Sequence, residues 1–195
     1  MNQEQLAKIK QKALEDHIPI IMDDTLEYIA TLLRKKQPTS FLEIGTAVGY
    51  SAICFSEYLA INGVIDTIEK EKERYQEAVE NIRNMDLQDK IHVLLADAVE
   101  ILPTIEKKYD IVFIDAAKGK YPFFFKQAMR LVKPDGMILA DNVLYKGYVL
   151  GDYNKHKQRT AVTHLREYLK LVQEEPSLET QILEIGDGLA VSTKK

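Results

Sequence analysis

The chain has 195 residues, of which 46% are hydrophobic and 29% are charged, and its formal net charge is −4. This length and composition suit one globular domain with a substantial core, so we expect a single domain over residues 1–195. The only cysteine, Cys54, excludes an internal disulfide framework. No apolar run reaches the roughly 18 residues of a membrane-spanning helix, so we expect a cytoplasmic protein with no membrane partner.

Apolar runs alternate with amphipathic stretches along the whole chain. Helices are expected where apolar residues recur at helical spacing, at 22–36, 50–61, 70–84, 99–105, 121–132 and 160–173. Strands are expected at the short apolar runs 41–45, 64–69, 91–97, 109–115, 137–142, 180–185 and 189–193. Residues 1–21 are expected to form an N-terminal helical segment or lid.

The order of these elements predicts an α/β fold. Strands that are apolar on both faces are typical of a parallel sheet covered by helices. The turn at 186–188, Gly-Asp-Gly, is a strong hairpin signal that adds an antiparallel strand near the C-terminus. We therefore expect a Rossmann-like, mostly parallel seven-stranded sheet with a C-terminal antiparallel hairpin and helices on both faces.

Charge is distributed unevenly along the chain. Residues 116–170 hold eleven Lys or Arg residues and four Asp or Glu residues, although the whole chain is negative. Two interpretations remain open at this point. The basic residues either cover solvated helix faces or form a surface that meets an anionic substrate.

The turn after the first strand is the first candidate binding site. Gly45 and Gly49 would let the backbone approach a ligand, but the spacing lacks the third glycine of a dinucleotide fingerprint and the lysine of a phosphate loop. Glu69, at the end of the second strand, could accept hydrogen bonds from ribose hydroxyls. Asp97, at the end of the third strand, could accept one from an adenine amino group. Each signal alone is weak, and together they favour S-adenosylmethionine.

The ends of the fourth and fifth strands form the second candidate site. Asp115 ends one strand, and Asp141 and Asn142 end the other, so the three side chains can converge if the strands are neighbours. Their hard oxygen atoms suit Mg²⁺ or a similar divalent cation. Lys118 follows closely, and positive charge nearby would disfavour its ammonium form, which would suit a general base. An exposed loop lysine is the equally weighted alternative.

Three segments resemble the signature segments of the cation-dependent O-methyltransferases, which include catechol and caffeoyl-CoA methyltransferases. They are Leu42–Ser51 (LEIGTAVGYS), Phe113–Lys118 (FIDAAK) and Ala140–Val143 (ADNV). The likeness extends from about Ile18 to the end of the chain. It implies an S-adenosylmethionine-dependent O-methyltransferase with a methyltransferase fold of the kind expected above.

The resemblance also assigns roles to individual residues. The implied metal ligands are Asp115, Asp141 and Asn142, and the implied catalytic base is Lys118. The segment 19–22 would close over the cofactor. The implied cofactor-binding residues are Ile21, Glu43, Gly45, Ser51, Glu69, Asp97, Ala98 and Asp115.

Within the family, the chain is most similar to bacterial enzymes that methylate 5-hydroxyuridine at the wobble position of tRNA. The matching stretches are 117–121, 141–149, Arg159 and 165–168. This likeness implies that the partner is the anticodon loop of a tRNA and that the chain forms a homodimer. Phosphate contacts of the basic residues would contribute to binding, and a wobble base can be splayed into a pocket.

Three alternatives remain from the sequence. A small catechol-like or phenolic acceptor would fit the same metal site, because it also presents two adjacent oxygens to one metal ion. Tyr145, Tyr148 and Tyr153 could then form a hydrophobic lid rather than stack on bases. An NAD-dependent enzyme is disfavoured by the missing third glycine, and a non-catalytic RNA-binding module is disfavoured by the complete set of candidate ligands.

Overall fold

A computed structural model describes residues 2–151 and 159–195. It divides into two compact units, Met1–Ile101 and Leu102–Lys195, which are described separately below. Among the described residues, no helix is both long enough and apolar enough to cross a membrane. The single domain expected from the sequence stays a prediction.

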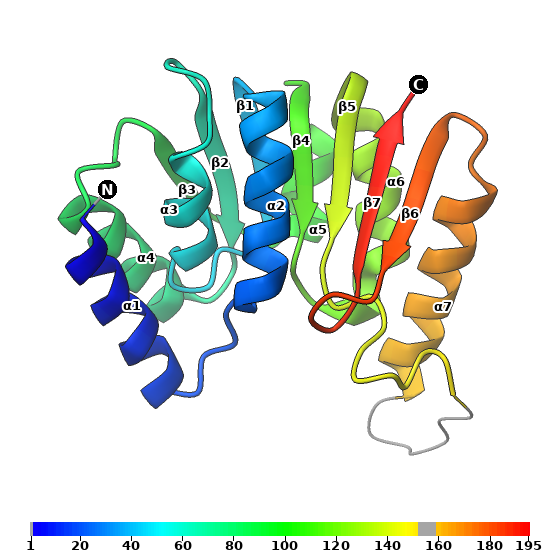
Figure 1. Cartoon of the computed structure of the whole chain (residues 1–195), viewed down its shortest axis with the longest axis horizontal. Helices are drawn as coiled ribbons and strands as arrows, with labels where there is room; N and C mark the ends of the chain where they lie inside the picture. Colours follow the sequence, from blue (N-terminus) through cyan, green and yellow to red (C-terminus); the bar gives the residue numbers. More distant parts are fainter. Residues whose placement is uncertain (1, 152–158) are drawn as a thin grey trace. The chain divides into compact units, whose positions relative to one another are not determined.

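The first unit contains three parallel strands in the order β3-β2-β1, with helices packed against them (Figure 1). Helices α3 and α4 contact β2 and β3, and α1 contacts α3. The elements are α1 (Gln3–Glu15), α2 (Asp23–Lys36), β1 (Ser40–Ile44), α3 (Tyr50–Ser56), β2 (Val64–Glu69), α4 (Lys72–Asn84), β3 (Ile91–Leu95) and α5 (Ala98–Ile101).

The second unit contains four strands in the order β4-β5-β7-β6. Strands β4 and β5 are parallel, whereas β7 is antiparallel to both β5 and β6. Helix α6 packs against β4 and β5, and α7 packs against α6 and β6. The elements are η1 (Leu102–Thr104), β4 (Tyr109–Ile114), η2 (Lys118–Lys120), α6 (Tyr121–Leu131), β5 (Val132–Ala140), α7 (Arg159–Glu174), β6 (Leu178–Leu183) and β7 (Leu189–Lys194).

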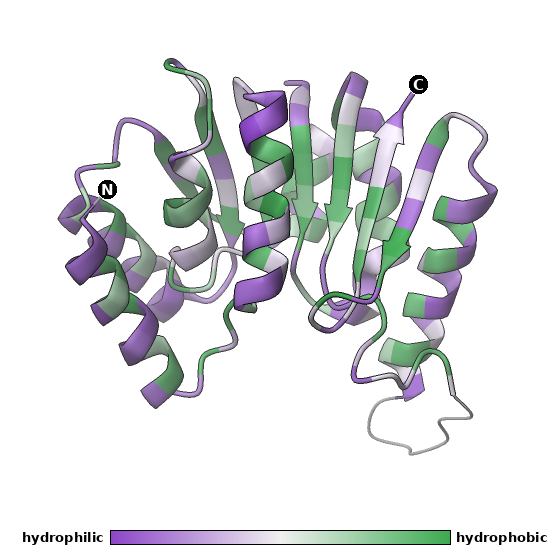
Figure 2. Ribbon diagram, viewed as in Figure 1, coloured by the Kyte–Doolittle hydropathy of each residue, from purple (hydrophilic) through white to green (hydrophobic). Residues whose placement is uncertain are grey.

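Burial of apolar strands explains why these segments adopt extended structure. Figure 2 shows apolar residues concentrated on the strands, and polar residues along the outer helix α1. Residues 111–114 of β4 and 138–140 of β5 have no exposed surface. Each side chain removed from water contributes roughly 25 cal/mol per Å² of buried apolar area, so these two strands form the centre of the second unit's core.

The β6–β7 turn is fastened to the chain that follows β5. The backbone N–H groups of Val143 and Leu144 donate to the carbonyls of Gly188 and Asp187, both at 2.9 Å. Gly188 has φ +92°, and a Cβ there would lie 2.4 Å from the Leu144 side chain. Only glycine fits this position, so the turn supports the segment that begins at Asn142.

Several elements differ from the sequence expectation by a few residues at their ends, and the two largest differences are in α3 and β5. Helix α3 ends at Ser56 rather than at 61, because the N–H of Ala60 turns back to the carbonyl of Pro38. Strand β5 begins at Val132 rather than at 137. The segment 133–136, expected to be a loop, lies within the strand, where Asp135 has φ +58° and the pairing with β4 shifts register.

Candidate active site

The first unit places Glu43 at the centre of a buried polar cluster. Its side chain is fully buried and accepts hydrogen bonds from Ser51 Oγ and Thr67 Oγ1, each at 2.5 Å. Thr67 Oγ1 also lies 2.6 Å from Thr46 Oγ1. The carboxylate of β1 is thus held by α3 and β2. The hydroxyl of Ser51, expected to contact cofactor, is directed at Glu43.

The glycine turn follows directly. The N–H groups of Gly45 and Thr46 both lie near the carbonyl of Ile68, at 3.1 and 3.2 Å, which ties the turn to β2. Gly45 and Gly49 have φ values of +106° and +81°, a region that glycine occupies without strain. The turn therefore bends sharply between β1 and α3 with little side-chain bulk.

Glu69 braces this turn from the end of β2. Its side chain is buried, and Oε2 accepts a hydrogen bond from the N–H of Ala47 at 2.9 Å. Oε1 accepts two more, from the N–H groups of Lys70 and Glu71, each at 2.9 Å. A carboxylate has about four acceptor positions. Any ribose hydroxyl would therefore share Glu69 with three backbone groups, a structural role that the sequence does not reveal.

The remaining cofactor candidates of this unit lie around the ends of neighbouring elements. Asp97 follows β3, whose Leu95 pairs with Glu69 in register. Its Oδ1 caps the short helix α5 by accepting from the N–H of Val99 at 2.7 Å. Ala98 begins that helix and is buried, and Ile21 is buried in the segment between α1 and α2.

The second unit brings Asp115 and Asp141 together. The last paired residues of β4 and β5 are Ile114 and Ala140, so each aspartate follows its strand at the same level of the sheet. Asp141 is 1% exposed. Burial, and next the charge of Asp115, raise the pKa of Asp141 to about 7. Burial also raises the pKa of Asp115, which the charge of Lys118 opposes.

Asn142 and Lys118 complete this cluster. Lys118 Nζ donates to Asn142 Oδ1 at 2.9 Å and lies 5.2 Å from the centre of the Tyr145 ring. Asn142 has φ +56°, and its N–H donates to Asp141 Oδ1 at 2.6 Å. The four residues assigned to metal binding and proton transfer are thus brought together within one unit.

The donor set fits a hard divalent cation. Two carboxylates and one amide oxygen are the ligand types that Mg²⁺ prefers, and three protein oxygens leave about three of six positions for substrate and water. Burial disfavours the charged forms of Asp115 and Asp141 and raises both pKa values, and the charge of Asp115 adds to the effect on Asp141. Across the described residues, no three His, Cys, Asp or Glu side chains gather as an alternative metal site.

Three residues near these sites were not anticipated from the sequence. Thr67 holds Glu43, Tyr121 bonds to the backbone at Asp141, and the charge of Asp187 contributes to the raised pKa of Asp141. The Gly-Asp-Gly hairpin signal contained Asp187 but did not show which strand its turn would reach. Nothing in the local sequence distinguishes Thr67 or Tyr121 from ordinary core residues.

Three of the eleven basic residues between 116 and 170 make contacts within the protein. Arg130 donates to the carbonyls of Leu102 and Ile105 at 2.6 and 2.7 Å, and Lys133 pairs with Asp110 at 2.9 Å. Arg166 donates to the carbonyls of residues 148, 149 and 151. These contacts lie within the protein, a use of the charge that neither of the two interpretations from the sequence included.

Part of the tRNA-like segments is also buried. Leu165 and Tyr168 have no exposed surface, so neither can contact RNA. Tyr145 and Tyr148 pack edge to face with ring centres 5.7 Å apart. Tyr153, the third tyrosine expected to stack or form a lid, lies outside the described residues.

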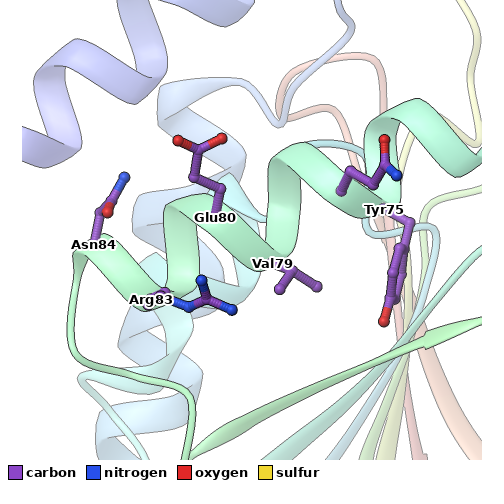
Figure 3. A pocket seen from close by; sticks show the side chains of 6 residues that line it. Tyr75, Val79, Glu80, Arg83 and Asn84 are labelled. Carbon is purple, nitrogen blue, oxygen red and sulfur yellow. The ribbon is translucent and has the colours of Figure 1, made fainter.

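A separate groove lies along one face of α4 (Figure 3). It is open to solvent and contains none of the residues assigned to cofactor, metal or catalysis. Its lining consists of Tyr75, Gln76, Val79, Glu80, Arg83 and Asn84. A groove formed along a single helix has no converging polar groups of the kind that define a ligand site.

Comparison with known proteins identifies the family. The model of a family described as O-methyltransferase matches residues 2–195. The chain belongs to the O-methyltransferase family. A catechol O-methyltransferase from Niastella koreensis is 30% identical to this O-methyltransferase over 178 residues, which cover 87% of this chain and 79% of that protein. A flavonoid 3′,5′-methyltransferase from Vitis vinifera is 28% identical over 96% of this chain and 86% of its own.

Solved structures agree. A crystal structure of a putative caffeoyl-CoA O-methyltransferase from Staphylococcus aureus matches with a TM-score of 0.90 at 32% identity, covering 97% of this chain and 92% of that one. An O-methyltransferase from Bacillus cereus in complex with S-adenosylhomocysteine matches with a TM-score of 0.90 at 26% identity, covering 98% and 91%. The expected fold, a mostly parallel seven-stranded α/β sheet with C-terminal antiparallel strands, and the expected enzyme class, an S-adenosylmethionine-dependent O-methyltransferase, are both confirmed.

Proposed function

We propose that this protein uses a divalent cation, Mg²⁺ or a similar ion, to methylate a small phenolic acceptor that carries two adjacent oxygens. The observation that carries the proposal is the cluster of Asp115, Asp141, Asn142 and Lys118. Asp115 and the buried Asp141, both with raised pKa values, form an unfavourable arrangement by themselves when both are charged. A bound cation would remove the unfavourable charge and would make use of the amide oxygen beside them.

The methyl donor of the proposal is S-adenosylmethionine. Its support is family membership, the S-adenosylhomocysteine in the Bacillus cereus structure, and the S-adenosylmethionine in an O-methyltransferase structure from Streptomyces achromogenes at 25% identity. In this chain the proposed holding residues are those named above, Ile21, Glu43, Gly45, Ser51, Glu69, Asp97, Ala98 and Asp115. Glu43 and Ser51 act in this proposal chiefly by fixing the glycine turn, in which Gly45 and Ala47 are partly exposed.

Asp115, Asp141 and Asn142 would hold the cation, and a cation held there would favour loss of the proton from the acceptor hydroxyl. Lys118 would receive that proton at Nζ, which requires the amine form of its side chain and release of its bond to Asn142. The deprotonated oxygen then forms its bond to the methyl carbon as the bond from that carbon to sulfur breaks, leaving S-adenosylhomocysteine. The protein contributes alignment of the oxygen with the methyl group, a factor that can account for several kcal/mol of the barrier.

Three observations favour a small acceptor over tRNA. The relatives named above are a catechol, a flavonoid and a putative caffeoyl-CoA methyltransferase. In the structure, Arg130, Lys133 and Arg166 are occupied by contacts within the protein, which reduces the basic surface available for phosphates. The aromatic pair Tyr145 and Tyr148, next to Lys118, suits a planar ring.

A homodimer, expected from the resemblance, remains a prediction.

The experiment that tests the proposal compares acceptors directly. Purified protein with S-adenosylmethionine and Mg²⁺ is assayed on a panel of catechols and hydroxycinnamic derivatives, and on tRNA that contains 5-hydroxyuridine. We expect kcat/KM for the best catechol-type acceptor to exceed that for phenols with a single hydroxyl, and chelation to abolish turnover. If the protein methylates only the tRNA efficiently, the proposed small acceptor is wrong and 5-hydroxyuridine in tRNA takes its place. Full activity after exhaustive metal removal would overturn the role of the cation.

A further inference from the structure

Tyr121 occupies an unusual position beneath the metal-ligand cluster. It begins α6, immediately after the η2 turn that carries Lys118, and its side chain has no exposed surface. Its hydroxyl donates to the backbone carbonyl of Asp141 at 2.7 Å, and the carbonyl of Ile114 lies 3.4 Å away. One side chain thus lies against the ends of both strands that carry the proposed ligands.

These two carbonyls lie at the point where the strand pairing stops. Ile114 and Ala140 are the last paired residues of β4 and β5, and the N–H of Asp141 still donates to the carbonyl of Ile114 at 3.1 Å. Beyond this point the segments that follow β4 and β5 are no longer paired as strands. The Tyr121 hydroxyl therefore adds a tie between the strands and the start of α6 where the ladder ends.

The tie opposes a definite force. Asp115 and Asp141 directly follow Ile114 and Ala140, which are paired in neighbouring strands, and two carboxylates placed in this way repel each other when both are charged. Without a tie, repulsion would favour separation of the two strand ends in the absence of a cation. Mg²⁺ requires near-ideal octahedral geometry, so small changes in the spacing of its ligands weaken binding.

We propose that Tyr121 is a positioning residue for the metal site. Its hydroxyl fixes the backbone of Asp141 relative to Ile114 and to the turn that carries Lys118, and so it presets the separation of the ligands. The inference rests on the cation proposed above. It goes further by assigning part of the metal affinity to a residue that touches neither the cation nor the substrate.

Tyr168 provides a matched control in the same aromatic cluster. Its ring packs edge to face against that of Tyr121 with centres 5.5 Å apart, and it is equally buried. Its hydroxyl is buried but has no hydrogen-bond partner among the described residues. Tyr168→Phe therefore removes the same atom from the same cluster without releasing a carbonyl of the ligand segment.

The test measures metal binding without turnover. Mn²⁺ is titrated into the full chain and into Y121F and Y168F, and free Mn²⁺ is read by electron paramagnetic resonance. Loss of a group that orients a metal ligand typically weakens binding by about 10–100-fold. We expect the Mn²⁺ dissociation constant of Y121F to rise by about tenfold and that of Y168F to change by less than about twofold. Binding of S-adenosylhomocysteine and thermal unfolding are measured on the same samples.

The outcomes separate the two proposals. Failure of the unaltered chain to bind Mn²⁺ overturns the metal site and this inference together. Normal Mn²⁺ binding by a folded Y121F overturns the inference alone, as does equal weakening in Y168F. If Y121F does not fold, position 121 is filled with 4-fluorophenylalanine or 4-aminophenylalanine. We expect only the latter, which keeps an N–H donor, to bind Mn²⁺ within about twofold of the unaltered chain, and equal affinities would overturn the inference.

Discussion

The two units both hold buried acidic side chains at strand ends, but they treat them differently. In the first unit, the carboxylates of Glu43 and Glu69 are satisfied by hydroxyl and backbone N–H donors. In the second unit, Asp115 and Asp141 follow the ends of neighbouring strands, and burial raises the pKa of each. A carboxylate with several hydrogen-bond donors stabilises the fold around it, whereas two neighbouring carboxylates whose charged forms are disfavoured by burial cost stability until a cation binds.

The difference also separates the two roles that the chemistry requires. The first unit presents a rigid glycine turn, held by Glu43 from within and by Glu69 from the side, and we propose that it binds a neutral ribose and a zwitterionic tail. The second unit concentrates negative charge, and we propose that it binds a metal ion. Substitutions in the first unit should therefore change cofactor binding and stability together. Substitutions in the second should change metal-dependent turnover with little loss of stability.

Asp141→Ala should give the largest effect. It removes a proposed ligand, and a metal ion contributes several kcal/mol of charge stabilisation, so turnover should fall by more than about 10³-fold. Cofactor binding should remain close to normal, since Asp141 belongs to the second unit. Turnover is measured with and without Mg²⁺, and S-adenosylhomocysteine binding by calorimetry. Near-normal activity of this variant in metal-depleted buffer would contradict the assignment of metal binding to the second unit.

Lys118→Ala tests the base. Loss of a positioned general base lowers kcat by about 10²–10⁴-fold, and the deficit should shrink as pH rises because hydroxide can take the proton. Lys120→Ala, in the same η2 turn but exposed, is the matched control and should retain kcat. The measurement is kcat and KM across pH on a catechol and on tRNA. A change confined to KM for tRNA would instead assign Lys118 to RNA contact.

Glu69→Gln tests the first unit more cleanly than an alanine, because Glu69 accepts three backbone N–H groups whose loss would also destabilise the glycine turn. The charged acceptor is lost while an oxygen is kept. A hydrogen bond to a charged group contributes about 1.5–3 kcal/mol, so the cofactor dissociation constant should rise by about 10–100-fold. Exposed Glu71→Gln serves as control. If the cofactor dissociation constant of Glu69→Gln is unchanged, Glu69 does not bind the cofactor ribose.

The pH dependence of stability gives the smallest expected effect. A raised pKa means that folded Asp141 holds its proton more tightly than an unfolded aspartate, whose pKa is about 3.9. In metal-free buffer, this contribution to stability is complete below about pH 4 and is lost as pH rises through about 7. We expect a loss of about 1–2 kcal/mol over this range, measured by denaturant unfolding. Mg²⁺ should restore it at pH 7.5, and Asp141→Asn should flatten the profile. If the stability of the unaltered chain does not change over this pH range, the raised pKa of Asp141 is contradicted.

Local sequence was sufficient where side-chain chemistry coincides with a strand end. Asp115, Asp141 and Asn142 were placed correctly relative to one another because apolar runs of this kind form parallel strands, and neighbouring strands end at one edge. The predicted bounds of α3 and β5 were wrong because tertiary contacts decide where these two elements end and begin. The backbone bond from Ala60 to Pro38 ends α3, and the pair that Val132 forms with Tyr109 of β4 extends β5 back across the unpaired residues 133–136.

The sequence by itself determined the alternation of strands and helices, the glycine turn and the acidic strand ends, because these depend on hydrophobic periodicity and backbone freedom over short distances. Only the tertiary structure decided how each polar group is used. It directs three backbone N–H groups to Glu69, Lys118 to Asn142 and the Tyr121 hydroxyl to the carbonyl of Asp141. These contacts join residues between 1 and 24 positions apart. Hydrogen-bond partners and desolvation depend on where the folded chain brings groups together, which no local pattern specifies.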